Sequence, residues 1–435
     1  MTKKRKNAEL GNGSHFETKS VHSGTPPDRV TGARNIPIYQ TTSYVFDNVD
    51  HASDLFNLQT FGFIYSRLTN PTVAALEERL ASLENGRACV AVASGHAAQF
   101  LAFFSLMGQN DEFIASKNLY GGSISQFNHS FKRLGWNCKF VDATKTKNIK
   151  NAISENTKAI FIEALANPGG IILDIEPIAK IANDAHVPLI VDNTLATPYL
   201  FKPIDWGADL VIESTTKFLS GHGTALGGAI IESGNFDWGK DNKFPFITEP
   251  DPAYHGLKFF ETFGDFAFSM KTRATALRDF GPCLSPANAF YTITGIESLP
   301  ARMERHVKNA TIIAKFLEKH EKVKWVSYAG LPSSPFYTLG KKYFSRGAGA
   351  VFTFGLHGGY TAGIKLVERV TLFSHLANLG DTRSLILHPA STTHRQLSEK
   401  QMIEAGASSD TIRLSIGQEN HIDLISDLEH ALKDL

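Results

Sequence analysis

The chain carries its apolar residues in two spacings, one typical of helices and one typical of buried strands. After Asn70, apolar side chains recur at steps of three and four residues: Val73, Leu76, Leu80 and Leu83. This is the spacing of one face of an α-helix. Asn70 is a suitable helix cap, Pro71 suits the first turn, and Asn85-Gly86 follows the last apolar position. We predict an amphipathic helix that begins at Asn70 and ends near Asn85.

Beyond this helix, short apolar runs alternate with longer helical stretches. Seven of the runs are strand candidates: 89–93, 112–115, 138–141, 159–162, 188–191, 210–212 and 229–231. They are almost continuously apolar, and crossover helices fit between several of them, which is typical of a parallel sheet covered on both faces. The pattern predicts an α/β fold with a mostly parallel seven-stranded sheet.

The two ends of the chain differ from this middle part in composition and in periodicity. Residues 1–69 are rich in Gly, Pro, Thr and Asn and show no sustained periodicity, which predicts an extended N-terminal arm. Beyond residue 300, helical stretches flank three further strand candidates, 322–328, 350–355 and 411–416. The final helix carries Ile422, Ile425, Leu428 and Leu432. We predict an arm (1–69), a large domain (70–299) and a smaller α+β domain (300–435), with a long loop at 244–263.

The composition is that of a globular protein without a strong charge. The chain has 435 residues, more than the ~250–300 at which a single hydrophobic core stops growing. Its formal charge of +1 creates no field that would gather nucleic acid or anionic lipid. The three cysteines form no C-x-x-C pair of the kind found in zinc or redox sites. No apolar run approaches the ~18 residues of a membrane span. The basic N-terminal segment is not followed by the apolar stretch of a secretory signal. We expect a soluble cytoplasmic protein with no nucleic-acid or membrane partner.

Polar residues follow several of the predicted strands. Ligands of open α/β sheets bind outside the carboxyl ends of the strands, so these residues are candidates for a shared site. They are Ser94, Gly95 and His96 after the first run, Glu163 and Asn167 after the fourth, Asp192 after the fifth, and Ser214, Thr216 and Lys217 after the sixth.

This combination suits pyridoxal 5'-phosphate. Lys217 would form a Schiff base with the aldehyde, and Asp192 would keep the pyridine nitrogen protonated so that the ring acts as an electron sink. The phosphate would be held by the backbone of Gly95 and His96, at the start of a helix, and by the Ser214 and Thr216 hydroxyls. Taken singly, each residue has an ordinary explanation as a turn, cap or core residue. Their joint placement at successive strand ends favours the cofactor.

Several ordered motifs resemble those of a known family. They are 65–71 (YSRLTNP), 93–98 (ASGHAA), 118–122 (NLYGG), 191–194 (VDNT), 213–218 (ESTTKF), 221–224 (GHGT) and 413–417 (RLSIG). Together they resemble the Cys/Met-metabolism pyridoxal-phosphate enzymes, the cystathionine γ-synthase-like family of fold type I. Segments 248–257, 380–385 and 388–394 resemble the O-acetylhomoserine sulfhydrylase branch. Three positions depart from common family residues: Ser220, Thr215 and Asn378.

The resemblance implies roles for single residues. Lys217 would bind the cofactor covalently and move protons, and Tyr120 would stack on the pyridine ring and assist proton transfer. Asn167 would hydrogen-bond the ring hydroxyl. Arg413 would clamp the substrate α-carboxylate, with help from Asn378.

The resemblance also implies an assembly. Tyr65 and Arg67 lie in the arm, before the first predicted helix, so we do not expect them to reach the sheet edge of their own subunit; in the family they contact the phosphate of the neighbouring subunit. A homodimer with shared active sites would follow, assembling further into a tetramer.

The implied reaction is γ-replacement, in which O-acetyl-L-homoserine and sulfide give L-homocysteine and acetate. A cystathionine γ-synthase or a β/γ-lyase on the same scaffold is the alternative. A nucleotide-dependent oxidoreductase is disfavoured because the glycines from Gly221 to Gly228 do not have the fingerprint spacing or a preceding strand. A metal centre is not expected either, since His388 and His394 do not match zinc-ligand spacing.

Overall fold

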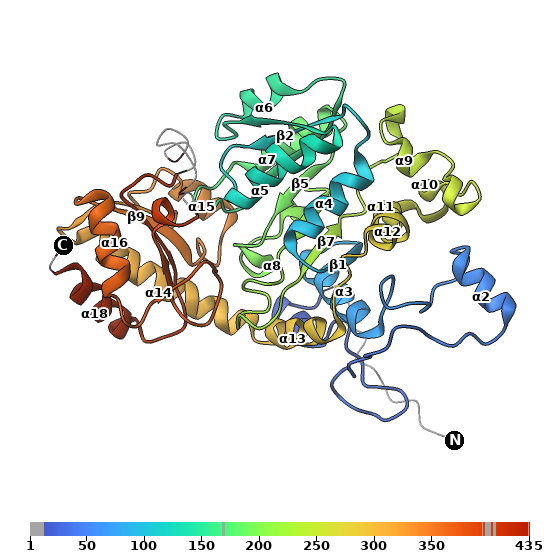
Figure 1. Cartoon of the computed structure of the whole chain (residues 1–435), viewed down its shortest axis with the longest axis horizontal. Helices are drawn as coiled ribbons and strands as arrows, with labels where there is room; N and C mark the ends of the chain where they lie inside the picture. Colours follow the sequence, from blue (N-terminus) through green and yellow to red (C-terminus); the bar gives the residue numbers. More distant parts are fainter. Residues whose placement is uncertain (1–12, 168–169, 394, 396–401, 403–405, 434) are drawn as a thin grey trace.

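The computed structural model describes residues 13–167, 170–393, 395, 402, 406–433 and 435. Two sheets dominate the structure, a seven-stranded one in the middle of the chain and a five-stranded one toward the C-terminus (Figure 1). The larger sheet has the order β1-β7-β6-β5-β4-β2-β3. Its strands are β1 (Ala88–Val92), β2 (Glu112–Ser116), β3 (Asn137–Val141), β4 (Thr157–Glu163), β5 (Leu189–Asp192), β6 (Leu210–Glu213) and β7 (Gly228–Glu232).

All seven predicted strands of this sheet are confirmed, and so is its mostly parallel character. Strands β3, β2, β4, β5 and β6 pair in parallel, and β7 runs antiparallel between β6 and β1. The ends of β4, β5 and β6 therefore lie side by side at one edge, whereas β7 ends at the opposite edge.

Apolar side chains of successive strand residues enter two separate cores, one on each face of the sheet. In β1, Cys89 and Ala91 belong to one core, and Val90 and Val92 to the other. Helices α3 (Pro71–Glu84) and α7 (Ile175–Asp184) contribute to the first core, and α4 (Gly95–Leu106) contributes to the second. This double burial is the physical reason for the continuously apolar strands.

Helix α3 confirms the helix predicted from Asn70. The Asn70 Oδ1 accepts hydrogen bonds from the backbone N–H groups of Thr72 (3.0 Å) and Val73 (3.4 Å), and Pro71 is the first helical residue. Asn85 ends the helix in the left-handed conformation, with φ of 59°.

The smaller sheet has the order β10-β11-β12-β9-β8. Strands β8 (Val323–Ser327), β9 (Val351–Leu356) and β12 (Thr411–Ser415) confirm the three strands predicted beyond residue 300. Helices α14 (Leu299–Lys319) and α18 (His421–Leu432) confirm the two predicted helices. Strands β10 (Ser374–His375) and β11 (Leu385–Leu387) were not predicted because they are too short to show a pattern. The proposed domain boundaries at 69 and 299 stay predictions.

The remaining helices are mostly short connections. They are α5 (Gly121–Ser125), α6 (Thr146–Ala152), α8 (Thr197–Leu200), α11 (Ala267–Lys271), α12 (Arg278–Phe280), α13 (Pro286–Glu297), α15 (Tyr337–Tyr343) and α16 (Gly359–Arg369). Shorter 3-10 or π-helical turns are η1 (Gln126–Ser130), η2 (Phe131–Leu134), η3 (Pro203–Trp206), η4 (Lys240–Asn242), η5 (Pro252–Tyr254), η6 (Gly264–Phe266), η7 (Thr272–Leu277) and η8 (Pro389–Ser391). No helix in the described part of the chain has the length and apolar character needed to cross a membrane.

Two stretches that were expected to lack regular structure contain short helices. The arm contains helices α1 (Phe16–His22) and α2 (Val49–Phe56), and the stretch 244–263 contains α9 (Pro245–Thr248) and α10 (Phe259–Phe263) rather than a continuous loop. These helices are too short for a periodic pattern, and each buries only one or two apolar side chains, such as Phe16 in α1 and Phe259 in α10.

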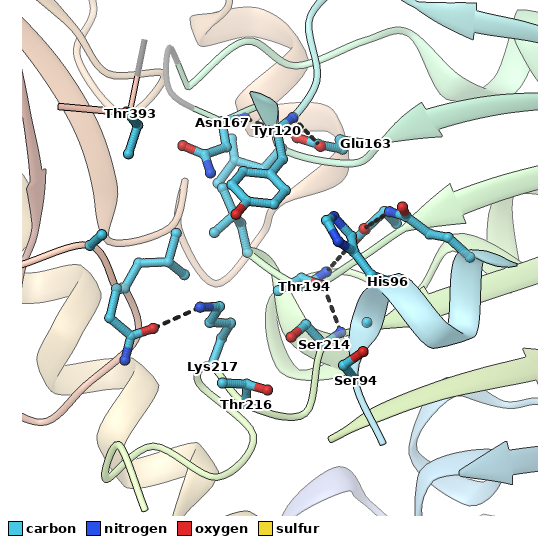
Figure 2. A pocket seen from close by; sticks show the side chains of 18 of the residues that line it. Ser94, His96, Tyr120, Glu163, Asn167, Thr194, Ser214, Thr216, Lys217 and Thr393 are labelled. Atoms are coloured by element: carbon cyan, nitrogen blue, oxygen red, sulfur yellow. Dashed lines mark hydrogen bonds between the residues drawn. The ribbon is translucent and has the colours of Figure 1, made fainter. Parts of the chain in front are cut away.

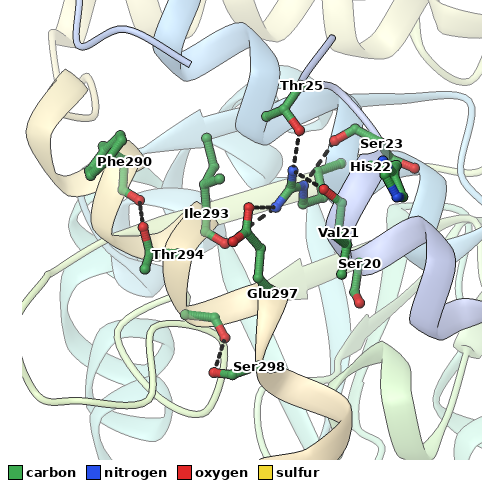
Figure 3. A network of polar contacts seen from close by, with 12 residues as sticks. Ser20, Val21, His22, Ser23, Thr25, Phe290, Ile293, Thr294, Glu297 and Ser298 are labelled. Carbon is green, nitrogen blue, oxygen red and sulfur yellow. Dashed lines mark hydrogen bonds and ion pairs between the residues drawn. The ribbon is translucent and has the colours of Figure 1, made fainter. Parts of the chain in front are cut away.

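The first helix of the arm is tied to α3 by the Arg79 side chain. Its fully buried guanidinium donates to the backbone carbonyls of Val21, Ser23 and Ile293 and to the Thr25 hydroxyl, and it pairs with Glu297 at 3.4 Å (Figure 3). One side chain therefore joins the arm to α3 and α13.

Candidate active site

A cavity of about 260 Å³ lies beyond the carboxyl ends of β4, β5 and β6. Ten of the twelve residues predicted for the site line it: Gly95, His96, Tyr120, Asn167, Asp192, Ser214, Thr216, Lys217, Asn378 and Arg413 (Figure 2). The small-domain residues enter from the segment 377–379 and from β12, so the cavity lies between the two sheets. Residues from distant parts of the sequence therefore line one cavity.

Lys217 follows β6 and extends into this cavity. Its Nζ donates a hydrogen bond to the Oδ1 of Asn378 at 2.7 Å. Burial, together with the positive charge of Arg413, lowers the pKa of Lys217 to about 8. An amine of this kind is partly neutral near physiological pH, as a nucleophile or base requires.

Asp192 ends β5 and is held by two neutral donors. Its Oδ1 accepts the backbone N–H of Thr194 at 3.0 Å, and its Oδ2 accepts from the Nε2 of Gln99 at 3.3 Å. Burial raises the pKa of Asp192 above its ordinary value. A buried carboxylate with neutral partners is well suited to a ligand that brings its own positive charge.

The turn after β1 approaches Ser214 closely. The Ser94 Oγ caps α4 by accepting the Ala97 N–H at 3.1 Å, and a Cβ atom at Gly95 would lie 2.9 Å from the Ser214 Cβ. Glycine is therefore needed at position 95. The Thr216 hydroxyl is hydrogen-bonded to the backbone of Gly227. The start of α4 at Gly95 and His96 lines the same cavity as the Ser214 and Thr216 side chains, an arrangement that suits a phosphate.

Tyr120 and Asn167 lie on the opposite wall of the cavity, and one carboxylate holds both. Glu163, the last residue of β4, accepts the backbone N–H of Tyr120 at 2.6 Å and that of Asn167 at 3.0 Å. The Tyr120 ring is 47% exposed and its centroid lies 5.7 Å from that of His96. The sequence indicated Glu163 as one of the polar residues at the sheet edge but assigned it no role.

Arg413 faces the cavity from β12. Its guanidinium donates to the backbone carbonyl of Asn378 at 3.1 Å and to the Oδ1 of Asn167 at 3.4 Å. Burial lowers the pKa of Arg413 to about 10, so the group stays cationic at neutral pH. The strand pattern alone left open which face of the sheet this arginine takes.

Tyr65 and Arg67 do not line the cavity of their own chain. The Arg67 guanidinium lies 5.4 Å from the centroid of the Tyr65 ring, and that ring is 41% exposed. The sequence analysis assigned no site role to further lining residues, namely Gln99, Leu165, Thr194, Leu195, Leu226, Ala377, Leu379 and Thr393. Gln99 lies one turn beyond His96 on α4, and this helical spacing was a usable signal for it.

The histidines do not form a metal centre in the described part of the chain. The buried His388 ring contacts the Ser391 hydroxyl and the Ser409 carbonyl, both at 2.9 Å. His394 lies outside the described residues. Within those residues no group of three or more His, Cys, Asp or Glu side chains is arranged to hold a metal ion.

The family model for the Cys/Met metabolism PLP-dependent enzymes matches residues 17–433. The chain belongs to this family. It is 48% identical to the O-acetyl-L-homoserine sulfhydrylase of Leptospira meyeri, over 96% of this chain and 97% of that protein. It is 47% identical to the O-acetyl-L-homoserine sulfhydrylase 1 of Thermus thermophilus, over 96% of this chain and 99% of that protein.

Solved structures of this family have the same fold. A Campylobacter jejuni protein assigned as an O-acetylhomoserine (thiol)-lyase superposes with a TM-score of 0.94 at 41% identity, covering 97% of this chain and 100% of that one, and it contains an N'-pyridoxyl-lysine-5'-monophosphate. The metB structure from Corynebacterium glutamicum superposes with a TM-score of 0.82 at 31% identity, covering 97% and 99%.

Pyridoxal 5'-phosphate is the cofactor of this Cys/Met-metabolism enzyme, and the cavity fits it. The cavity offers a lysine whose pKa is lowered to about 8 and a buried carboxylate without a cationic hydrogen-bond partner. It also has a glycine turn that closely approaches the hydroxyl-bearing Ser214. These features match the aldehyde, the ring nitrogen and the phosphate of the cofactor, in that order.

Proposed function

We propose that this enzyme catalyses γ-replacement, converting O-acetyl-L-homoserine and sulfide into L-homocysteine and acetate. The main support is the pair of sulfhydrylases at 47% and 48% identity, which match this chain over nearly their whole length. When bound, pyridoxal phosphate supplies an aldehyde that bonds to the substrate amine and a cationic ring that delocalises negative charge from the substrate carbon.

In this proposal Lys217 attaches the cofactor and then acts as the base. Its Nζ takes the proton from the substrate Cα, and the pKa of about 8 keeps part of the amine neutral for this task. Asn378 accepts a hydrogen bond from the amine at 2.7 Å and so defines a position for the free side chain. Tyr120 covers the ring and assists the same proton transfer.

Asp192 keeps the ring nitrogen protonated. Gln99 and Thr194 hold its two oxygens in place, so the carboxylate does not have to reorient when the cofactor binds. The backbone of Gly95 and His96 and the hydroxyls of Ser214 and Thr216 bind the phosphate.

Arg413 binds the α-carboxylate of the amino-acid substrate, and its planar guanidinium fixes which bond at Cα is broken. Asn167 orients this guanidinium and hydrogen-bonds the ring hydroxyl, and Asn378 assists at the carboxylate. Among the described lining residues, Arg413 and Lys217 are the only arginine and lysine. A succinyl or phosphoryl leaving group would bring a negative charge without a further partner there, which favours the acetyl ester.

We also propose that the enzyme works in the cytoplasm as a dimer with shared active sites that assembles into a tetramer. The arm supports this because it exposes apolar side chains, with Val30 at 91%, Val45 at 97% and Phe61 at 71% exposure. In such a dimer Tyr65 and Arg67 would complete the phosphate site of the neighbouring subunit.

The purified holoenzyme tests the reaction directly. We expect homocysteine from O-acetyl-L-homoserine and sulfide, with much lower rates for the succinyl and phosphoryl esters and with cysteine in place of sulfide. K217A should lose turnover by at least about a thousandfold, because the attachment point and the base are both removed. Cystathionine formed from cysteine at a higher rate than homocysteine from sulfide would instead establish the γ-synthase alternative, and breakdown of cystathionine would establish the lyase.

A further inference from the structure

Glu163 lies at the end of β4, 5% exposed, and both of its oxygens accept main-chain N–H groups. One donor is Tyr120, 43 residues away in sequence, and the other is Asn167, four residues ahead. A single side chain therefore joins two loops that approach the cavity from different parts of the sheet, as Figure 2 shows.

The two donors carry the side chains that line one wall of the cavity. The Tyr120 ring enters the cavity beside His96, and the Asn167 amide oxygen accepts a hydrogen bond from Arg413 at 3.4 Å. Any movement of either backbone N–H would therefore displace a group that faces the cofactor or the substrate. The next strand places Asp192 directly beside Glu163 in the sheet register.

We propose that Glu163 is a positioning residue for the cofactor. It holds the backbone of Tyr120 and of Asn167 in place, so that both side chains meet the bound ring. This inference rests on the proposed roles of Tyr120 and Asn167 at that ring. Glu163 has a fixed geometric task because each oxygen of its carboxyl group accepts one of the two N–H groups, whereas an amide offers one acceptor and one donor.

E163Q is the sharpest variant for this reason. The glutamine oxygen still accepts one N–H, but its NH2 group faces the other N–H, so one of the two loops has to move. E163A removes both acceptors. A misplacement of about 1 Å at a group that contacts the reacting centre is enough to cause a large loss of catalytic rate. We expect the dissociation constant of pyridoxal phosphate to rise about tenfold in E163Q and further in E163A.

Glu232 provides a matched control within the same sheet. It is 2% exposed and accepts the backbone N–H groups of Phe268 (3.3 Å) and Ser269 (2.8 Å) and the Trp238 indole N–H. It ends the antiparallel β7, at the sheet edge opposite the cavity. E232Q therefore makes the same chemical change in a similar environment, away from the cofactor.

The experiment titrates apoenzyme with pyridoxal phosphate and records the visible circular dichroism of the bound cofactor, which reports how asymmetrically the protein holds it. We expect E163Q to weaken both this circular-dichroism band and the affinity for pyridoxal phosphate. E232Q should lower thermal stability but leave the band and the affinity unchanged. Equal effects of E163Q and E232Q, or an E163Q affinity within twofold of wild type, would overturn the proposal.

A double-mutant cycle with Y120A separates positioning from general destabilisation. If Glu163 acts through Tyr120, E163Q should cost much less affinity in the Y120A background than in wild type. Fully additive losses would count against the proposal. If E163Q does not fold, E163D serves instead, because it keeps the carboxyl group but is one methylene too short to hold both N–H groups. All these readouts use cofactor alone, so they stand or fall independently of the homocysteine assay.

Discussion

The amine of Lys217 is both the attachment point and the base in the proposed reaction, and its surroundings set the pH at which it can act. Burial and the nearby Arg413 charge lower its pKa from the ordinary 10.5 to about 8. Only the neutral amine attacks an aldehyde, so cofactor capture by the apoenzyme should become about tenfold faster per pH unit up to pH 8 and then level off. Stopped-flow absorbance between pH 6 and 10 measures this rate. A rise that continues to pH 10 would contradict the lowered pKa.

Two carboxyl groups without a cationic hydrogen-bond partner lie buried beneath the site. The Glu84 Oε1 accepts from the Asn193 Nδ2 at 2.8 Å, whereas its other oxygen and both oxygens of Glu213 lack a donor among the described residues. Burial raises the pKa of Glu84 from 4.5 to about 7 and also raises that of Glu213. We predict that the two groups share a proton in the folded state.

We expect this pair to make the fold less stable as the pH rises. Between pH 4.5 and about 7 the folded state keeps the Glu84 proton that the unfolded state has lost, so the free energy of unfolding falls across that window. E84Q needs no such proton. Urea unfolding of the apoenzyme at pH 5 and pH 8 should therefore show a smaller loss in E84Q, by on the order of 1–3 kcal/mol. An equal loss in both proteins would refute the shared proton.

The residues that sequence reasoning could place are those whose role follows from strand order. Lys217 and Asp192 follow predicted strands of one sheet, so their meeting at one edge could be expected. Helical spacing could place Gln99 beside His96 on α4, but the contact of Gln99 with Asp192 and the contacts of Glu163 could not be predicted, because they depend on which groups these side chains reach. Those contacts are set by packing between elements that are distant in sequence.

At the scale of elements, Asn70 connects the start of α3 to the arm. Its Oδ1 caps the helix, while its Nδ2 donates to the Tyr39 carbonyl at 2.8 Å and to the Ser66 hydroxyl at 3.0 Å. Ser66 lies between Tyr65 and Arg67, so this amide also fixes the part of the arm that is proposed to reach the neighbouring subunit.

Substitutions at Asn70 separate these two tasks. N70D keeps a good capping oxygen but loses the donors to the arm, so we expect limited proteolysis between residues 39 and 66 to become faster while α3 stays intact. N70A loses both functions and should cost a further ~1 kcal/mol of unfolding free energy. Proteolysis followed by mass spectrometry, together with urea unfolding, measures the two effects. Unchanged cleavage of the arm in N70D would show that the amide does not anchor it.

Element prediction succeeded where burial imposes a long pattern and failed where it does not. The seven strands of the large sheet are apolar on both faces and could be read directly. Helix α1 spans seven residues, of which only Phe16 and Ser20 are buried, so no periodicity could reveal it. Its place in the molecule depends on the Arg79 contacts to Val21 and Ser23, which no local pattern encodes.

At the scale of the whole molecule, the cavity is assembled from two sheets and, in our proposal, from two subunits. Arg413 reaches it from β12 and Lys217 from the loop after β6. Arg67, which lies in the arm, does not line this cavity in its own chain. In this proposal the function of the arm therefore depends on the assembly. A test of the assembly has to distinguish residues that act in the site of their own subunit from residues that act in the site of the neighbouring subunit.

Mixing the two inactive variants K217A and R67A tests whether Arg67 acts in the site of the neighbouring subunit. K217A disables a subunit's own site, whereas R67A disables the site of its neighbour. In a heterodimer one site then has neither residue and the other has both, so subunit exchange of equal amounts should restore about a quarter of the wild-type activity. Mixing K217A with D192N is the matched control, and it should restore none, because both residues serve the same chain's site and every site keeps one lesion. If heterodimers form but K217A with R67A recovers no activity, Arg67 does not act across the interface.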